Sequence, residues 1–200
     1  MFRLSAVLLA VLLIFGLVFS LLPSGGDVAR SGVTLRGVQL SLYPEQDPDA
    51  VWRFRATALR VDPLKSENTL DGLGQGERWL KKPDGSETLN LTLKADHLVI
   101  DADSNLRAEQ AQIYILDGCV TLNMRSAAGK PVFINQRSGY SAPDVQVSSP
   151  SLNLGFDDFS SSFDFKNARG DQRPGASAQI HPSSVCKAGK IVPRAPSSQP

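Results

Sequence analysis

The chain of 200 residues has few of the residues that most enzyme chemistry requires. It contains two histidines and two cysteines, and its formal net charge is only +1. Two cysteines exclude a disulfide-dense scaffold and a four-cysteine zinc site. A net charge close to zero argues against a nucleic-acid-binding protein that depends on phosphate neutralisation. No serine lies in a Gly-x-Ser-x-Gly motif and no glycine-rich phosphate loop precedes a helix, so we expect no enzyme, no cofactor and no metal site.

Charge is also missing near the N-terminus, where the nineteen residues from Leu4 to Leu22 are all uncharged. As a helix this run would be about 28 Å long, close to the thickness of the hydrocarbon core of a bilayer. We predict a retained transmembrane anchor over residues 1–22 and a tether over 23–32, with a cleaved signal peptide as the alternative. Because Arg3 precedes the run, the prediction is a single-pass protein of the inner (cytoplasmic) membrane whose remaining chain lies in the periplasm or an equivalent extracytoplasmic space.

Between residues 33 and 166 no stretch keeps a helical apolar period over three turns, whereas apolar and polar residues alternate repeatedly. This alternation, broken by Pro, Gly and Asp-rich turns, predicts an all-β domain of about eight to ten short antiparallel strands, in a sandwich, barrel or open roll. The edges of the sheet are expected at the first strand, Val33–Leu42, and at the last, Val145–Phe156, where partners can pair.

Two segments of the β region echo each other. Residues 54–62 read FRATALRVD and residues 93–101 read LKADHLVID. In both copies the apolar face shifts by three positions, in the first copy from Ala56 to Leu59. Because successive residues of a flat strand point to opposite faces, we predict a β-bulge in each copy and two adjacent strands that bend together.

Three short segments resemble a known family. The tryptophan-led strand Trp52–Ala56 follows the N-terminal anchor, and Leu93–Asp101 and Gly118–Leu122 have the patterns Ala-Asp-x-Leu-x-Ile-Asp and Gly-x-Val-x-Leu. Together they resemble the LptC-type lipopolysaccharide export proteins and the unit shared by LptC, LptA and OstA-like proteins. The resemblance implies an open antiparallel sheet folded over as a β-taco or half jelly roll, and edge-to-edge pairing with other β domains, including those of an inner-membrane ABC transporter complex. The Gly-rich stretch Pro63–Pro83 is interpreted as a long loop.

The resemblance further implies an apolar interior that holds the acyl chains of lipopolysaccharide or a similar amphipathic envelope lipid. A structural envelope scaffold with a closed β core and no lipid cargo is the alternative, and the two hypotheses share one sequence signature. What separates them is whether the interior contains a cavity. The residues expected to line the lipid groove are Trp52, Phe54, Leu59, Val61, Leu91, Leu93, Leu98, Ile100, Ile113, Ile115, Val120 and Leu122.

The last thirty-four residues, 167–200, contain no aromatic residue and have five basic residues against one acid. Such a basic, Ser/Pro/Gly-rich segment buries too little surface to fold, so we predict a disordered tail. Cys119 and Cys186 are a candidate disulfide if the domain is exported to an oxidising compartment, the alternative being two unrelated free thiols. The acidic run Asp101–Asn105 is interpreted as a hairpin turn rather than a calcium loop, and His97 as a solvated or hydrogen-bonded strand residue.

Overall fold

The computed structural model describes residues 33–178 and 183–194, and the chain there forms fourteen β-strands and one short 3-10 turn. All pairings between these strands are antiparallel. The predicted all-β, antiparallel class is therefore confirmed. In chain order the elements are β1 (Val33–Leu42), β2 (Ala50–Asp62), β3 (Glu67–Lys81), β4 (Glu87–Ile100), β5 (Leu106–Ala108), β6 (Gln110–Ile115), η1 (Asp117–Cys119), β7 (Val120–Arg125), β8 (Val132–Asn135), β9 (Gly139–Ser148), β10 (Leu152–Ser161), β11 (Arg169–Gln172), β12 (Ser177–Ala178), β13 (Ser184–Lys187) and β14 (Lys190–Pro193).

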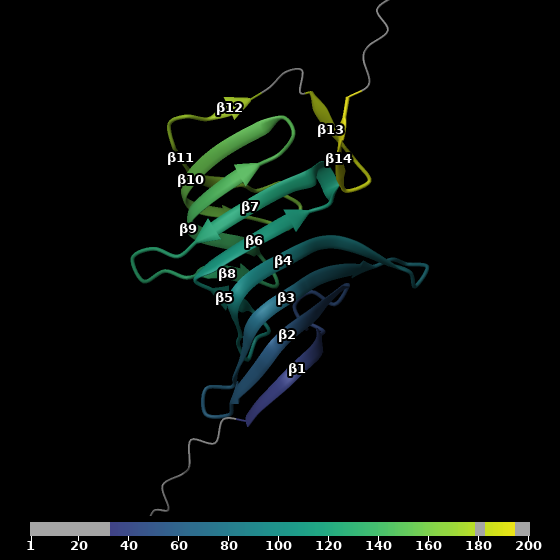
Figure 1. Ribbon diagram of the computed structural model, residues 1–200, viewed down its shortest axis with the longest axis vertical. Helices are drawn as coiled ribbons and strands as arrows, with labels where there is room; N and C mark the ends of the chain where they lie inside the picture. The colour runs from purple at the N-terminus through teal and green to yellow at the C-terminus, as the bar shows by residue number, and fades with distance from the viewer. Residues whose placement is uncertain (1–32, 179–182, 195–200) are drawn as a thin grey trace, which may run out of the picture. The chain divides into compact units, whose positions relative to one another are not determined.

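The main sheet runs in the order β1-β2-β3-β4-β5-β8-β9-β10-β11, and β6 and β7 pair with each other and with β4 and β9 (Figure 1). Six strands therefore close a ring, β4-β5-β8-β9-β7-β6. The ring arises because β5 and β6 both pair with the long strand β4, while β8 and β7 both pair with β9. The alternation of residues left a sandwich, a barrel or an open roll, and the family resemblance implied an open sheet. The structure instead has a closed middle, with β1–β3 extending from β4 and β10–β12 extending from β9.

The long strands bend at one row of residues that crosses the sheet, and β2, β3 and β4 curve side by side in Figure 1. The β1–β2, β2–β3 and β3–β4 ladders each skip a pair at this row. Gly72 in the row has a φ of +61°, and a Cβ there would lie 2.4 Å from the hydroxyl of Thr57. Both its backbone angle and its surroundings therefore require glycine. The row consists of Gly37, Thr57, Gly72 and Asp96.

This bend accounts for the internal echo. Ala56 and Leu59 are both buried although they are three positions apart, because the strand bends at Thr57 between them. The predicted change of face is confirmed, but neither echoed segment contains the predicted bulge. One extra residue lies on β3, around Gly74, and another lies on β4 at Asn90, before the second echoed segment. The echoed strands β2 and β4 are not adjacent either, since β3 lies between them.

The stretch Pro63–Pro83, interpreted from the sequence as a loop, contains β3, which pairs with β2 and β4 along its length. Glycines obscured this strand because they interrupt the alternation of apolar and polar side chains. At Gly76 a Cβ would lie 3.0 Å from the backbone oxygen of Leu93, so the missing side chain lets β3 and β4 approach. β3 places Arg78 on the inner face of the sheet.

The prediction of a disordered tail over 167–200 is wrong for the described residues of that segment. β11 and β12 pair with β10, and β13 and β14 form a hairpin. Arg173 adds a hydrogen bond of 2.6 Å to Asp144 and approaches Asp157 at 3.7 Å. Backbone pairing and ion pairs order this segment, whereas composition reports only the apolar surface available for burial. The β domain therefore continues beyond residue 166.

Of the two predicted edges, one is confirmed. β1 has the predicted bounds and lies at the end of the sheet order. The predicted edge Val145–Phe156 is wrong, because it covers parts of β9 and β10, each of which has neighbours on both sides. The predicted anchor, 1–22, and tether, 23–32, lie outside the described residues. In the part of the chain that the structure describes, no helix has the length and apolarity needed to cross a bilayer.

Candidate functional site

All twelve residues expected to line a lipid groove lie in or against one apolar cluster inside the sheet. Ten of them are 0–7% exposed, and Val61 and Val120 are half-buried against the same cluster. The structure therefore brings the predicted residues together, but mostly as a packed core rather than as a groove open along its length. The ten buried ones are Trp52, Phe54, Leu59, Leu91, Leu93, Leu98, Ile100, Ile113, Ile115 and Leu122.

Arg78 is the only charged side chain that is buried among the described residues. It lies on β3 opposite Trp52 of β2 and Leu91 of β4. Residues directly opposite each other on neighbouring strands point to the same face of a sheet. Arg78 therefore points into the apolar interior, and four of its five row neighbours belong to the predicted lipid-lining set. These neighbours are Leu42, Trp52, Leu91, Ile115 and Val120.

The guanidinium of Arg78 has partners on two of its three nitrogens. Nη2 donates to Oδ2 of Asp47 and Nη1 donates to Oδ1 of Asn90, both at 2.5 Å. Its Cζ lies 4.2 Å from the ring centroid of Phe163, a cation–π contact. Nε has no hydrogen-bond partner within the described chain. Because desolvation offsets the attraction in a buried ion pair, the Arg78–Asp47 pair adds little net stability, whereas breaking it leaves a buried charge uncompensated.

Tyr140, on β9, is a second buried polar group near Arg78. It is 2% exposed, and its hydroxyl has no partner among the described residues. Its ring meets the ring of Phe163 edge-on, with 5.0 Å between centroids, and lies 6.3 Å from that of Phe165. Burial raises the pKa of the Tyr140 phenol, and the positive charge of Arg78 opposes this rise in part. The phenol is therefore neutral and available as a hydrogen-bond donor.

A cavity of about 340 Å³ lies at the end of the sheet where β3 and β6 finish and β4 and β7 begin. A second cavity, of about 650 Å³, shares three lining residues with it: Leu80, Asn90 and Asp117. Five apolar residues line the smaller cavity together with four polar ones, which are Asn90, Asp117, Asp164 and the buried Arg78. Such a mixture of apolar walls and a few polar groups is found in small-molecule sites. Its apolar walls are Leu80, Ile115, Val120, Phe163 and Phe165.

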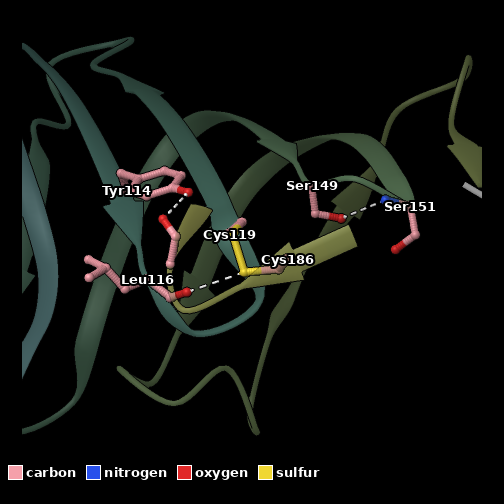
Figure 2. The surroundings of a disulfide bond; sticks show 7 residues. Tyr114, Leu116, Cys119, Ser149, Ser151 and Cys186 are labelled. Atoms are coloured by element: carbon pink, nitrogen blue, oxygen red, sulfur yellow. Dashed lines mark hydrogen bonds between the residues drawn. A yellow bond between two sulfur atoms is a disulfide. The ribbon is translucent and has the colours of Figure 1, made fainter. Parts of the chain in front are cut away.

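A disulfide between Cys119 and Cys186 fastens the β13–β14 hairpin beside these cavities (Figure 2). The candidate disulfide is thus present. Tyr114 donates a hydrogen bond of 2.9 Å to the carbonyl oxygen of Gly189, in the turn of the hairpin. A Cβ on Gly189 would lie 3.0 Å from the side chain of Leu116, so the turn packs tightly against the end of β6. The hairpin forms one wall of the larger cavity.

The other polar candidates have structural roles. Asp101 accepts hydrogen bonds from the backbone N–H groups of Asp103 and Asn105, at 3.0 and 2.8 Å, which confirms the predicted hairpin turn. The exposed His97 is hydrogen-bonded to Asp71 at 2.6 Å. A hydrogen bond from Arg60, and a weaker contribution from His97, lower the pKa of Asp71. Among residues 33–178 and 183–194 no cluster of His, Cys, Asp or Glu has metal-holding geometry.

Sequence reasoning missed Arg78, Tyr140 and Phe163. Arg78 lies in the stretch Pro63–Pro83 that the sequence predicted as a loop, and its neighbours Glu77 and Trp79 give no alternation of apolar and polar residues. Tyr140 and Phe163 lie in segments without a clear apolar period.

The chain was compared with protein-family models and with curated proteins, and neither comparison gave a match. Function must therefore be argued from the site itself, since a fold class alone supports many functions.

Proposed function

We propose that this chain is a membrane-anchored lipid-binding module of the cell envelope, similar to LptC, which accepts an acyl chain of lipopolysaccharide or a related lipid. The observation that carries the proposal is the cavity of about 340 Å³, in which five of the nine lining residues are apolar. Burying each CH₂ of an acyl chain contributes roughly 0.8 kcal/mol, so a chain segment of several CH₂ groups in this space offsets much of the free-energy cost of association. The lipid enters at this end of the sheet rather than along an open taco.

The second part of the proposal is transfer of the lipid to a β-domain partner, with an ABC transporter complex as the membrane neighbour. β1 supports it, because this strand pairs only with β2 in the described chain and its outer edge is free. Val33 and Leu35 on β1 are 56% and 48% exposed. A free edge with exposed apolar side chains can accept a strand from another chain.

The alternative is an envelope scaffold that assembles through its edges and carries no lipid. The burial of ten of the twelve predicted lipid-lining residues favours this alternative. Under it, the cavity beside Val120 is a packing defect at the end of the core, and only the edge of β1 is functional.

A photo-crosslinking residue at Val120 separates the two hypotheses. Val120 lines the cavity, whereas Asn123, on the same strand, is exposed and serves as the matched control. In cells that make the full chain, we expect lipid to be captured at position 120 and not at 123, and native mass spectrometry of gently extracted protein should find the same lipid. Capture at neither position, with no co-purified lipid, would establish the scaffold alternative.

A further inference from the structure

Three buried hydrogen-bond donors have no acceptor in the described chain: Nε of Arg78, Nε of Arg107 and the hydroxyl of Tyr140. Of these residues, Arg78 lines the cavity and Tyr140 contacts Phe163 of the cavity wall. A protonated guanidinium has donors only, so Nε–H requires an acceptor. Arg78 and Tyr140 both contact Phe163, whose ring centroid lies 4.2 Å from Cζ of Arg78 and 5.0 Å from the ring centroid of Tyr140. Buried polar groups in native proteins are nearly always hydrogen-bonded, and the cavity that Arg78 lines gives room for an acceptor on a ligand.

The charges around the cavity select against an anion as that acceptor. Asp47 already neutralises Arg78 through their ion pair. Asp117 and Asp164 also line the cavity, and only Asp164 is paired with a cation, Lys166, within the described chain. A carboxylate or phosphate would therefore meet uncompensated negative charge, which destabilises it in a partly desolvated site. A neutral acceptor meets no such penalty.

We propose that Arg78 and Tyr140 form a subsite for the carbonyl oxygen of an ester- or amide-linked acyl chain. The oxygen accepts hydrogen bonds from Nε–H and from the phenol, while the hydrocarbon chain lies against Leu80, Ile115 and Phe165. This inference rests on the proposed lipid-binding function and adds a chemical class to it. The site prefers acyl esters and amides to ethers of the same chain length and to free fatty acids.

A matched set of twelve-carbon ligands tests the preference. The full chain is reconstituted in phosphatidylcholine vesicles and photolysed with a diazirine-bearing lauroylglycerol, and mass spectrometry quantifies the crosslinks to the peptide that contains Phe163 and Phe165. The competitors are 1-monolauroylglycerol, which has the carbonyl, 1-O-dodecylglycerol, which lacks it, and dodecanoate, which carries a charge. We expect the ester to halve capture at a concentration about tenfold lower than the ether does, as one charge-assisted hydrogen bond would give, and dodecanoate to be weaker than the ester.

Two variants locate the preference in the protein. Arg78→Lys keeps a positive charge for Asp47 but has no N–H at the ε position, so the ester-to-ether ratio should fall to about one. Tyr140→Phe removes a hydroxyl that has no partner to lose, so it folds and should reduce the ratio to about threefold. Arg53→Lys, on the outer face of β2 and 42% exposed in its side chain, is the control that should leave the ratio unchanged.

Failure of this inference and failure of the proposed function give different results. If the ester and the ether displace the probe equally from the wild-type chain, or if dodecanoate competes best, the carbonyl subsite is refuted while lipid binding stands. An unchanged ratio in Tyr140→Phe refutes the role of the phenol even if Arg78→Lys does not fold. If the peptide containing Phe163 captures no probe at all, the lipid-binding function itself is refuted.

Discussion

Trp52 and Arg78 are direct neighbours across β2 and β3, and both point into the same core. They differ in that the polar atom of Trp52 is hydrogen-bonded within the chain, whereas one polar atom of Arg78 is not. The indole N–H of Trp52 donates to Oε1 of Gln136 at 2.9 Å. Gln136 in turn donates to the carbonyl oxygen of Ser104 at 2.7 Å and, through its backbone N–H, to Oδ1 of Asn105 at 3.2 Å. Every group in this network is matched within the chain.

Arg78, at the same depth, keeps one donor without a partner, as does Tyr140 beside it. The difference indicates two purposes for buried polar groups in one core. A network that is complete within the chain joins distant segments, here β2 to the turns before β5 and after β8, and it fixes how they pack. An incomplete one beside a cavity retains hydrogen-bonding capacity for something that is not part of the chain.

Removing the disulfide near Arg78 should have the largest effect on the free energy of unfolding. Replacing Cys119 and Cys186 with alanine opens a cross-link between residues 67 positions apart, and the free energy of unfolding measured in urea should fall by roughly 4 kcal/mol on the chain-entropy estimate. Amide hydrogen exchange under native conditions should accelerate most in β13 and β14 and least around Gln136. This is because the hairpin is attached at Cys119 and Tyr114, whereas Gln136 is hydrogen-bonded to Trp52, Ser104 and Asn105. Equal acceleration at both places would contradict the distinction between the two regions.

Breaking the ion pair of Arg78 should have the next largest effect. Asp47→Ala leaves a buried guanidinium without its carboxylate, which we expect to lower the free energy of unfolding by about 3 kcal/mol. Asp49→Ala, in the same loop, is the control, because Asp49 is exposed and its loss should change stability by less than about 0.5 kcal/mol. Equal effects of the two substitutions in urea denaturation would mean that Arg78 is not held by Asp47 in solution.

Breaking the hydrogen-bond network of Trp52 and Gln136 should lower the free energy of unfolding by somewhat less. Gln136→Ala removes the acceptor of the Trp52 indole and should lower the free energy of unfolding by about 2 kcal/mol, because that N–H is left buried and unmatched. Trp52 emission should also change, since its hydrogen bond is lost. The neighbouring Arg137→Ala is the control, because Arg137 is exposed. If Gln136→Ala had the same free energy of unfolding as the wild type, the indole N–H of Trp52 would not depend on Gln136. The contrast with the site around Arg78 would then be lost.

The sequence predicted the core better than it predicted the site, and the reason is physical. Alternation with a period of two indicates which residues face inward: ten of the twelve predicted residues are in the core cluster, and Val61 and Val120 pack against it. The alternation does not indicate the order of the strands, nor that the six strands β4 to β9 close into a ring, because both depend on pairings between distant segments. It also fails where glycine replaces a side chain, as at Gly76, where the need for glycine comes from the backbone of Leu93.

The site depended on two contacts that no local pattern encodes. Arg78 is tolerated in the core because Asp47, 31 positions away, neutralises it; a lone arginine among glycines otherwise indicates a solvated loop. The ordering of the tail depends on Cys186 reaching Cys119 and on backbone pairing with β10. In both cases the interaction that stabilises the segment lies elsewhere in the chain, where composition and periodicity carry no information about it.

The smallest expected effect sharpens the comparison most. Tyr140→Phe removes a hydroxyl without a partner in the described chain, so in ligand-free protein the free energy of unfolding should stay within about 0.5 kcal/mol of the wild-type value or rise slightly, because a desolvated polar group is removed at constant shape. Tyr114→Phe is the matched control, since the Tyr114 hydroxyl donates to Gly189 and its loss should destabilise the chain by about 1 kcal/mol. Urea denaturation of both variants measures the difference. If Tyr140→Phe were the more destabilising of the two, its hydroxyl would have a partner within the folded chain, and the contrast with Trp52 would disappear.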